Sequence, residues 1–228
     1  MSSVVPSTAC EYRIERKAQR FKSQPASPDV GGNFFYRHFK TAFDIFGSSI
    51  LLVVTAPVMV VIAVLIKCTS PGPIIFKQER LTAHGRKFTI LKFRTMKFAA
   101  DSKSLVWTEK NDPRVTPVGS VLRVTRLDEL PQLFNVLKGD MSLIGPRPER
   151  PEFTQTLAKE IPGFHRRLQI KAGLTGLAQV GNGYTATIED YRKKLAWDRL
   201  YILKRSVWLD LWITLKTIAV VISGRGAR

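Results

Sequence analysis

Two adjacent carboxylates, Asp128 and Glu129, are the residues of this sequence best suited to chemistry. Apolar side chains recur after them at steps of three and four residues, which predicts an amphipathic helix from about Asp128 to Lys138. Pro131 fits this helix because backbone N–H groups in a first turn have no helical partners. The helix would place both carboxylates at its N-terminus, beside free N–H groups and the positive end of the dipole.

Two interpretations of these carboxylates are open. In the structural one, Asp128 caps the helix and Glu129 is a first-turn charge, and neither takes part in a reaction. In the functional one, Asp128 stays ionised and shares its position with a phosphate or metal site. Spacing alone favours the structural interpretation, because helix caps are far commoner than nucleophiles.

A stiff basic loop follows the predicted helix. Pro146 and Pro148 have fixed backbone φ angles, so they are expected to hold Arg147 between them in one pose. A guanidinium held in this way can bind an oxyanion through two hydrogen bonds. Arg123 and Arg126 precede the helix, so basic, acidic and rigid elements meet in one short stretch of chain.

The composition indicates an anionic partner. The 228 residues include 36 Lys and Arg against 18 Asp and Glu, a formal net charge of +18. Nucleic acid, an acidic membrane surface and phosphorylated substrates would each attract such a chain. The basic residues are spread among apolar runs instead of being gathered in one arm, which argues against nucleic acid. The cysteines and histidines show neither a disulfide framework nor a zinc-binding spacing.

The N-terminal part combines a polar tail with a long apolar segment. Residues 1–33 lack apolar periodicity and are predicted to be a disordered basic tail without a cleavable signal peptide. Ile45–Ile66 carries no charged residue and is long enough to span a bilayer. Pro57 near its middle and basic residues on both flanks are typical of a helix that enters one leaflet, bends and returns. The residues themselves leave both arrangements open.

The rest of the chain predicts a hairpin and several helices. Residues 73–96 are expected to form two short strands around Ala83-His84-Gly85, or a strand and a loop, with a solvated basic face. A further helix with tryptophans and internal charges is typical of a segment lying at the level of lipid headgroups. The expected helices run from Thr116-Pro117 toward Arg123, and over residues 151–160, 188–204 and 207–222.

The run from Leu127 to Glu149, LDELPQLFNVLKGDMSLIGPRPE, resembles the signature of the bacterial sugar transferase family, the monotopic polyprenyl-phosphate phosphoglycosyl transferases. This stretch is long and ungapped, and the wider resemblance extends from about residue 39 to residue 224. The run KFRTM, which contains Arg94, is similar to the family as well. Asp198 aligns with an acidic residue of the family's active site, although its spacing also fits an i,i+4 pair with Lys194.

The resemblance implies an α-rich α+β fold. The chain would be embedded in the membrane by a re-entrant broken helix at residues 34–70, where Ala56 stands in place of a serine common in the family. Residues 71–224 would form a catalytic domain with interfacial amphipathic helices and a small β-hairpin, followed by a tail at 225–228. The implied location is the cytoplasmic face of the bacterial inner membrane.

The resemblance also implies a reaction. A sugar-1-phosphate would pass from a UDP-sugar to a polyprenyl phosphate, expected to be undecaprenyl phosphate, with release of UMP. Asp128 would attack as the nucleophile and form an aspartyl-phosphosugar intermediate, and it would also hold Mg²⁺, with Glu129 in support. This would be the first membrane step of exopolysaccharide or other surface glycan synthesis. The expected substrate-binding residues are Arg94, Arg123, Pro146, Arg147, Pro148 and Asp198.

Several points stay open at this stage. Membrane lipids are expected partners and nucleic acid is not, while a homo-oligomer is neither required nor excluded. A non-catalytic basic membrane-anchored scaffold is the alternative function, but it leaves the acidic pair and the Pro-Arg-Pro loop unexplained. The glycine-rich run 171–177 is either a phosphate loop or a tight turn. The family's arginine after this run is missing near Gly183, and Arg192 is a candidate to replace it.

Overall fold

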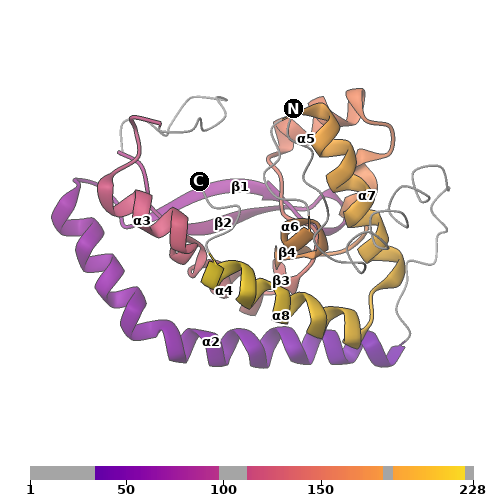
Figure 1. Cartoon of the computed structure of the whole chain (residues 1–228), viewed down its shortest axis with the longest axis horizontal. Coiled ribbons are helices and arrows are strands. Elements are labelled where there is room, and N and C mark those ends of the chain that lie inside the picture. Colours follow the sequence, from indigo (N-terminus) through magenta and orange to yellow (C-terminus); the bar gives the residue numbers. More distant parts are fainter. Residues whose placement is uncertain (1–33, 98–111, 182–186, 224–228) are drawn as a thin grey trace.

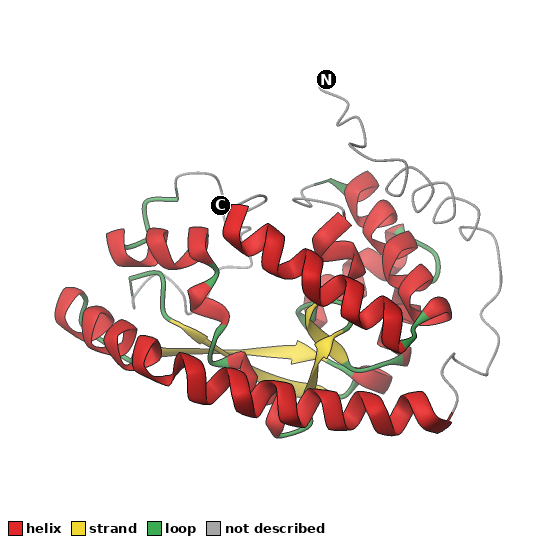
Figure 2. Ribbon diagram, turned by 60° about the horizontal axis from the view of Figure 1, so that its bottom comes forward, coloured by secondary structure: helices red, strands yellow, loops and turns green. Residues whose placement is uncertain are grey.

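The structure, a computed structural model, describes residues 34–97, 112–181 and 187–223. Helices dominate it, and small two-stranded sheets lie among them (Figures 1 and 2). The α-rich α+β class expected from the sequence is confirmed in this respect. The tails predicted at 1–33 and 225–228, and the loop around Gly183, lie outside the described residues.

The elements, in chain order, are α2 (Phe34–Thr69), β1 (Ile75–Leu81), η2 (Ala83–Gly85), β2 (Lys87–Phe93), α3 (Pro117–Thr125), η4 (Leu127–Glu129), α4 (Gln132–Leu137), β3 (Met141–Ile144), α5 (Pro151–Glu160), η5 (Phe164–Gln169), β4 (Ala172–Thr175), α6 (Leu177–Gly181), α7 (Ile188–Lys204) and α8 (Val207–Ser223), where η marks a 3-10 turn.

Helix α2 is long, apolar and bent. It contains Pro57, and a proline inside a helix removes a backbone hydrogen bond and bends the axis. Figure 1 shows α2 running along the base of the molecule and turning upward toward its C-terminal end. By length and composition α2 could cross a membrane, and only 11% of its most apolar window is buried inside the protein. Its apolar side chains therefore mostly face outward.

Both ends of α2 pack against the same folded domain. Near the start of the helix, Tyr36 donates a hydrogen bond from Oη to Oδ2 of Asp210 on α8, at 3.0 Å. Near its end, Ile66 is buried in a cluster with Phe93 of β2 and Leu122 of α3. The helix thus lies along the domain over most of its length, as the two views of the ribbon also show.

Strands β1 and β2 form the predicted hairpin. They pair antiparallel in a register that runs from Ile75 opposite Phe93 to Leu81 opposite Lys87. The connecting turn η2 places His84 and Gly85 in the left-handed region, with φ angles of 56° and 72°. Glycine meets this requirement without the steric cost that a Cβ atom brings, so the expected turn position is confirmed.

The helix predicted from Asp128 to Lys138 is wrong at its start. Arg126 adopts a left-handed conformation, with φ of 58°, and ends α3. The 3-10 turn η4 follows, and α4 begins only after Pro131. Asp128 therefore lies inside a tight turn and does not cap a helix, so its environment must come from neighbouring side chains and not from a helix dipole.

The protein does not cover all of the apolar stripe of this segment. Phe134 and Leu137 are 51% and 38% exposed. Leu133 and Val136 instead enter the main core cluster, which joins β2, β3, α6, α7 and α8. Helical periodicity identifies an apolar stripe but does not say whether protein or another apolar medium covers it.

The glycine-rich run forms β4 and packs tightly. Strand β4 pairs in parallel with β3, and its backbone presses against Gly145 at the start of the Pro-Arg-Pro loop. A Cβ atom on Gly173 would lie 2.1 Å from the Gly145 nitrogen, and one on Gly176 would lie 2.1 Å from the Gly145 oxygen. The glycines therefore permit close backbone approach, and Ala172–Thr175 is a strand where a phosphate loop or a tight turn was expected.

The C-terminal helices have the predicted bounds to within a residue or two. Trp208 on α8 is 79% exposed, in line with an outward-facing aromatic. Asp210, however, is fully buried and accepts a hydrogen bond from Oη of Tyr201 at 2.7 Å. Its charge therefore does not mark a headgroup-facing surface, and only Lys216 of the two internal charges lies on the outer part of α8.

Candidate active site

The turn that holds the acidic pair is positioned from both sides. On one side, Thr116 caps α3 by accepting a hydrogen bond from the Gly119 nitrogen at 2.9 Å, and α3 leads directly into the left-handed Arg126. On the other side, Asn135 of α4 accepts from the Leu91 nitrogen at 3.0 Å and so ties α4 to strand β2. The carboxylates are thereby brought against the end of β2.

Glu129 is fully engaged with two cations. Its Oε1 accepts a hydrogen bond from Nζ of Lys92 at 3.0 Å, and its two oxygens accept both terminal nitrogens of Arg147, one of them at 3.0 Å. Burial alone would raise the pKa of Glu129, but Arg147 and Lys92 outweigh it and hold the pKa well below its usual range. Glu129 is therefore a permanent anion that orients the cations around it.

Asp128 differs from its neighbour. It is only 8% exposed, and within the described part of the chain its carboxylate accepts no hydrogen bond and forms no ion pair. Burial raises its pKa, the nearby Lys92 opposes this shift, and the charge of Glu129 adds to it. Arg147 and Arg123 also lower the pKa of Asp128 from close by. The site therefore holds one carboxylate that is surrounded by cations yet uncommitted to any of them.

The Pro-Arg-Pro loop is held by its carbonyl groups. The prolines have no N–H to donate, so the loop depends on what donates to its oxygens. The Pro146 oxygen accepts from the Gly173 nitrogen at 2.9 Å, and the Pro148 oxygen accepts from Arg80 at 3.2 Å. The Arg147 oxygen accepts from Nη2 of Arg167 at 2.8 Å. The expectation of a fixed Arg147 is consistent with these contacts.

The two remaining predicted arginines lie differently. Arg123 donates from Nε to Oγ1 of Thr95 at 2.9 Å and acts on Asp128 electrostatically. Arg94 is buried and donates to the oxygens of Ser70 and Pro71 at 2.7 and 2.5 Å. Arg94 therefore fastens the C-terminal end of α2 to the hairpin and does not join the group around Asp128.

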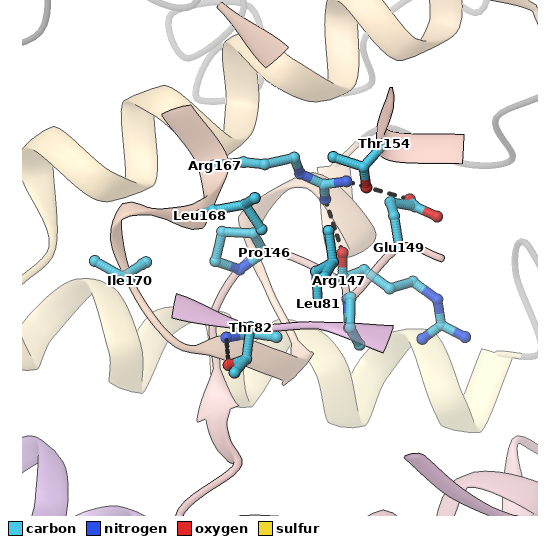
Figure 3. A pocket seen from close by; sticks show the side chains of 11 residues that line it. Leu81, Thr82, Pro146, Arg147, Glu149, Thr154, Arg167, Leu168 and Ile170 are labelled. Carbon is cyan, nitrogen blue, oxygen red and sulfur yellow. Dashed lines mark hydrogen bonds and ion pairs between the residues drawn. The ribbon is translucent and has the colours of Figure 1, made fainter. Parts of the chain in front are cut away.

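Asp198 lies behind the Pro-Arg-Pro loop. It is 2% exposed, and its Oδ2 accepts from Nε of Arg167 at 3.0 Å. The i,i+4 pair with Lys194 expected as an alternative does not form, since Nζ of Lys194 donates to Oε1 of Glu149 at 2.6 Å. Figure 3 shows the small pocket between the loop and Arg167, with the Arg147 guanidinium directed away from it. Arg192, the candidate replacement arginine, lies on the outer side of α7 beside Glu189.

Sequence reasoning missed two cations of the site region. Lys92 was assigned to a solvated basic face, but it is turned inward onto Glu129. The sequence signal was a break in the alternation of apolar and polar residues, because Ile90 and Leu91 are adjacent just before Lys92. Arg167 had no comparable signal, since its partners Glu149 and Asp198 are far away in sequence.

The donor set around Asp128 fits a magnesium ion. The described residues contain no cluster of three or more potential metal-ligating side chains, so an all-protein metal cage is not formed there. Mg²⁺ is often held by one or two carboxylates together with substrate phosphates. The uncommitted carboxylate of Asp128 meets this description, whereas both oxygens of Glu129 are already occupied by cations.

Comparison with known proteins identifies the family of the chain. The model of the bacterial sugar transferase family matches residues 35–224. An N-acetylgalactosaminephosphotransferase of Aeromonas hydrophila that uses UDP-N-acetylgalactosamine and undecaprenyl phosphate is 45% identical over 85% of this chain and 46% of its own. A UDP-glucose:undecaprenyl-phosphate glucose-1-phosphate transferase of Klebsiella pneumoniae is 43% identical over 90% of this chain and 45% of its own.

The chain spans about half the length of these two relatives. It covers 92% of a third, the exopolysaccharide production protein PSS of Rhizobium leguminosarum, which is 40% identical over 78% of this chain. The family match includes the acidic turn, the Pro-Arg-Pro loop and every described helix. The chain therefore belongs to the bacterial sugar transferase family.

Proposed function

We propose that this protein transfers a sugar-1-phosphate from a UDP-sugar to undecaprenyl phosphate or a related polyprenyl phosphate. An oxygen of Asp128 attacks the β-phosphorus, the bond from that phosphorus to the bridging oxygen breaks, and UMP leaves. An oxygen of the lipid phosphate then attacks the same phosphorus, and the Asp128 carboxylate is released. The products are UMP and a polyprenyl diphosphate sugar.

The observation that carries this proposal is the difference between the two carboxylates. A nucleophile must be ionised and must have an oxygen free to attack, and Asp128 has no hydrogen-bond partner within the described residues. Glu129 is held as an anion, but Lys92 and Arg147 occupy its oxygens. Glu129 therefore acts by placing these cations beside Asp128, where a diphosphate would sit.

The cations of the site have distinct tasks. Arg147 presents a planar fork that can bind two phosphate oxygens, and Lys92 contributes a compact charge. Arg123, held by Thr95, adds positive charge on the side of α3. A Mg²⁺ ion bound at Asp128 together with the substrate diphosphate would offset the negative charge of the leaving UMP.

The proposed membrane arrangement is re-entrant and places the site at the cytoplasmic face. Two observations support it. Tyr36 and Ile66, at opposite ends of α2, contact the same charged domain, whereas the ends of a straight spanning helix lie on opposite sides of a bilayer. Other helices also carry exposed large apolar side chains, among them Phe134, Trp208 and Leu215. These side chains would bring the site to the level of a lipid phosphate.

The proposed cellular role is the first membrane step of exopolysaccharide or another surface glycan. It is supported by the name of the Rhizobium relative, the exopolysaccharide production protein PSS, which this chain matches over 92% of its length. The test of the reaction is a panel of UDP-sugars incubated with purified protein, undecaprenyl phosphate and Mg²⁺, scored by UMP release. At least one sugar should give release over many turnovers that requires the lipid, and Asp128→Asn should give none. Lack of release with every sugar would overturn the proposed reaction.

A further inference from the structure

Arg167 connects two parts of the molecule that sequence reasoning did not relate. Its Nη2 donates to the main-chain oxygen of Arg147 at 2.8 Å and also lies 2.9 Å from Oδ2 of Asp198. Its Nη1 lies 3.3 Å from Oε1 of Glu149, the residue that ends the Pro-Arg-Pro loop. One guanidinium therefore holds the middle and the end of this loop at once.

The contacts of Arg167 lie on the reverse side of Arg147. Figure 3 shows Arg167 approaching the Arg147 backbone, while the Arg147 guanidinium extends in another direction. That guanidinium contacts Glu129, next to Asp128. Arg167 is thus one residue removed from the reacting groups: it touches the backbone of the residue that touches them.

The surroundings of Arg167 make it rigid. Its side chain is 2% exposed and that of Asp198 is 3% exposed, so neither is free to swing into solvent. Oδ2 of Asp198 accepts a hydrogen bond from Nε of Arg167 at 3.0 Å and lies 2.9 Å from Nη2 as an ion pair, which orients the guanidinium. A buried and oriented donor of this kind can define the position of a loop that has few N–H groups of its own.

We propose that Arg167 is a positioning residue for the reaction and that Asp198 acts through it, without contacting the substrate. This inference rests on the proposed function. Arg167 sets the main-chain position of Arg147, and Asp198 sets the orientation of Arg167. Asp198 is then needed because it keeps the Arg147 guanidinium in the position that binds the phosphate oxygens. Small displacements from such a position lower the reaction rate.

The test is a double-mutant cycle between Arg147→Lys and Arg167→Lys. The second substitution keeps the charge that pairs with Asp198, but one ammonium does not reproduce the planar fork that joins Asp198 to the Arg147 oxygen. Arg167→Lys should lower kcat/KM about tenfold and show the same division between kcat and KM as Arg147→Lys. If Arg167 acts through Arg147, the double variant should stay within about threefold of Arg147→Lys alone.

The matched control is Arg86→Lys. Arg86 forms an ion pair with Asp140 at 2.9 Å and does not contact the loop. Its effect, whatever its size, should multiply with that of Arg147→Lys, because independent sites are additive in free energy. An Arg167→Lys effect that multiplies in the same way, giving roughly a 100-fold combined loss, would overturn the proposal.

A second variant covers the case in which Arg167→Lys does not fold. Asp198→Asn keeps the shape of the side chain, and its smaller loss of kcat/KM should likewise vanish in the Arg147→Lys background. Full additivity for Asp198→Asn would refute the proposal in the same manner. A wild-type chain that releases no UMP would instead defeat the proposed function. Calorimetric titration with UDP measures the coupling between Arg147 and Arg167 a second time, through the affinity for UDP. Losses of affinity that add in the double variant would be sufficient to overturn the inference.

Discussion

Arg147→Lys tests how the Pro-Arg-Pro loop contributes to the reaction. Arg147 donates a hydrogen bond from each terminal nitrogen to the two oxygens of Glu129, and the remaining N–H groups of its guanidinium are the donors proposed to bind phosphate. Lysine keeps the positive charge but has a single ammonium, so it can place one donor where arginine places two. The substitution therefore removes geometry while it leaves charge in place.

The size of the effect follows from one lost charged hydrogen bond. Such a bond contributes roughly 1.5–3 kcal/mol, which corresponds to about 10- to 150-fold in rate if it is realised in the transition state. The side chain of Arg147 is 31% exposed, and partial access to water favours the lower part of this range. We expect kcat/KM for UMP release to fall about tenfold or somewhat more.

The matched control for this prediction is Arg150→Lys. Arg150 lies three residues further along and pairs with the exposed Glu152 at 3.5 Å, so the same chemical change there should alter kcat/KM by less than about twofold. Turnover of Arg147→Lys at the level of this control would show that the Pro-Arg-Pro loop is only structural. It would refute the role assigned to the guanidinium.

Three further outcomes are expected. Glu129→Gln should shift the acidic limb of the pH profile of kcat/KM to lower pH, because the negative charge of Glu129 helps to raise the pKa of Asp128. An acidic limb at the same pH as in the wild type would disprove this coupling. Gln132→Met should raise the midpoint of thermal unfolding by an amount equivalent to about 1 kcal/mol in the free energy of unfolding. The reason is that neither amide atom of this buried side chain has a hydrogen-bond partner among the described residues. A lower midpoint would contradict this prediction. Single-cysteine variants that retain only Cys10 or only Cys68 should be labelled from the cytoplasm alone, whereas periplasmic labelling of Cys10 would demonstrate a spanning α2.

Much of the fold could be predicted because its signals are local. The hairpin turn needs a residue at positive φ, and Gly85 supplies it where the sequence indicated a turn. Thr116 and Pro117 begin α3 as a cap and a first-turn proline do. Periodicity over residues 188–204 was sufficient to place α7.

Other features depended on partners that are distant in sequence. The left-handed Arg126 breaks the helix expected at Asp128, and arginine carries no signature for that conformation. Phe134 follows the apolar period but points outward, since a pattern of apolar spacing is the same for a core and for a membrane-facing surface.

The acidic pair and Arg147 could be singled out in the sequence, but the different contacts of the two carboxylates could not. Asp128 and Glu129 are equivalent in sequence, and only the folded chain shows that Lys92 and Arg147 bind one of them and leave the other uncommitted. Likewise, Asp198 was expected beside the substrate, yet its contact is with Arg167 behind the loop.

The covalent role of Asp128 is the central claim, and one measurement addresses it directly. Purified protein loaded with Mg²⁺ is mixed with a UDP-sugar that carries label in its β-phosphate, without any lipid acceptor. The account predicts label on Asp128 together with about one equivalent of UMP, and a folded Asp128→Asn that binds the UDP-sugar but acquires no label. Release of UMP only when polyprenyl phosphate is added, with no labelled protein at any time, would show direct attack by the lipid phosphate and contradict the account.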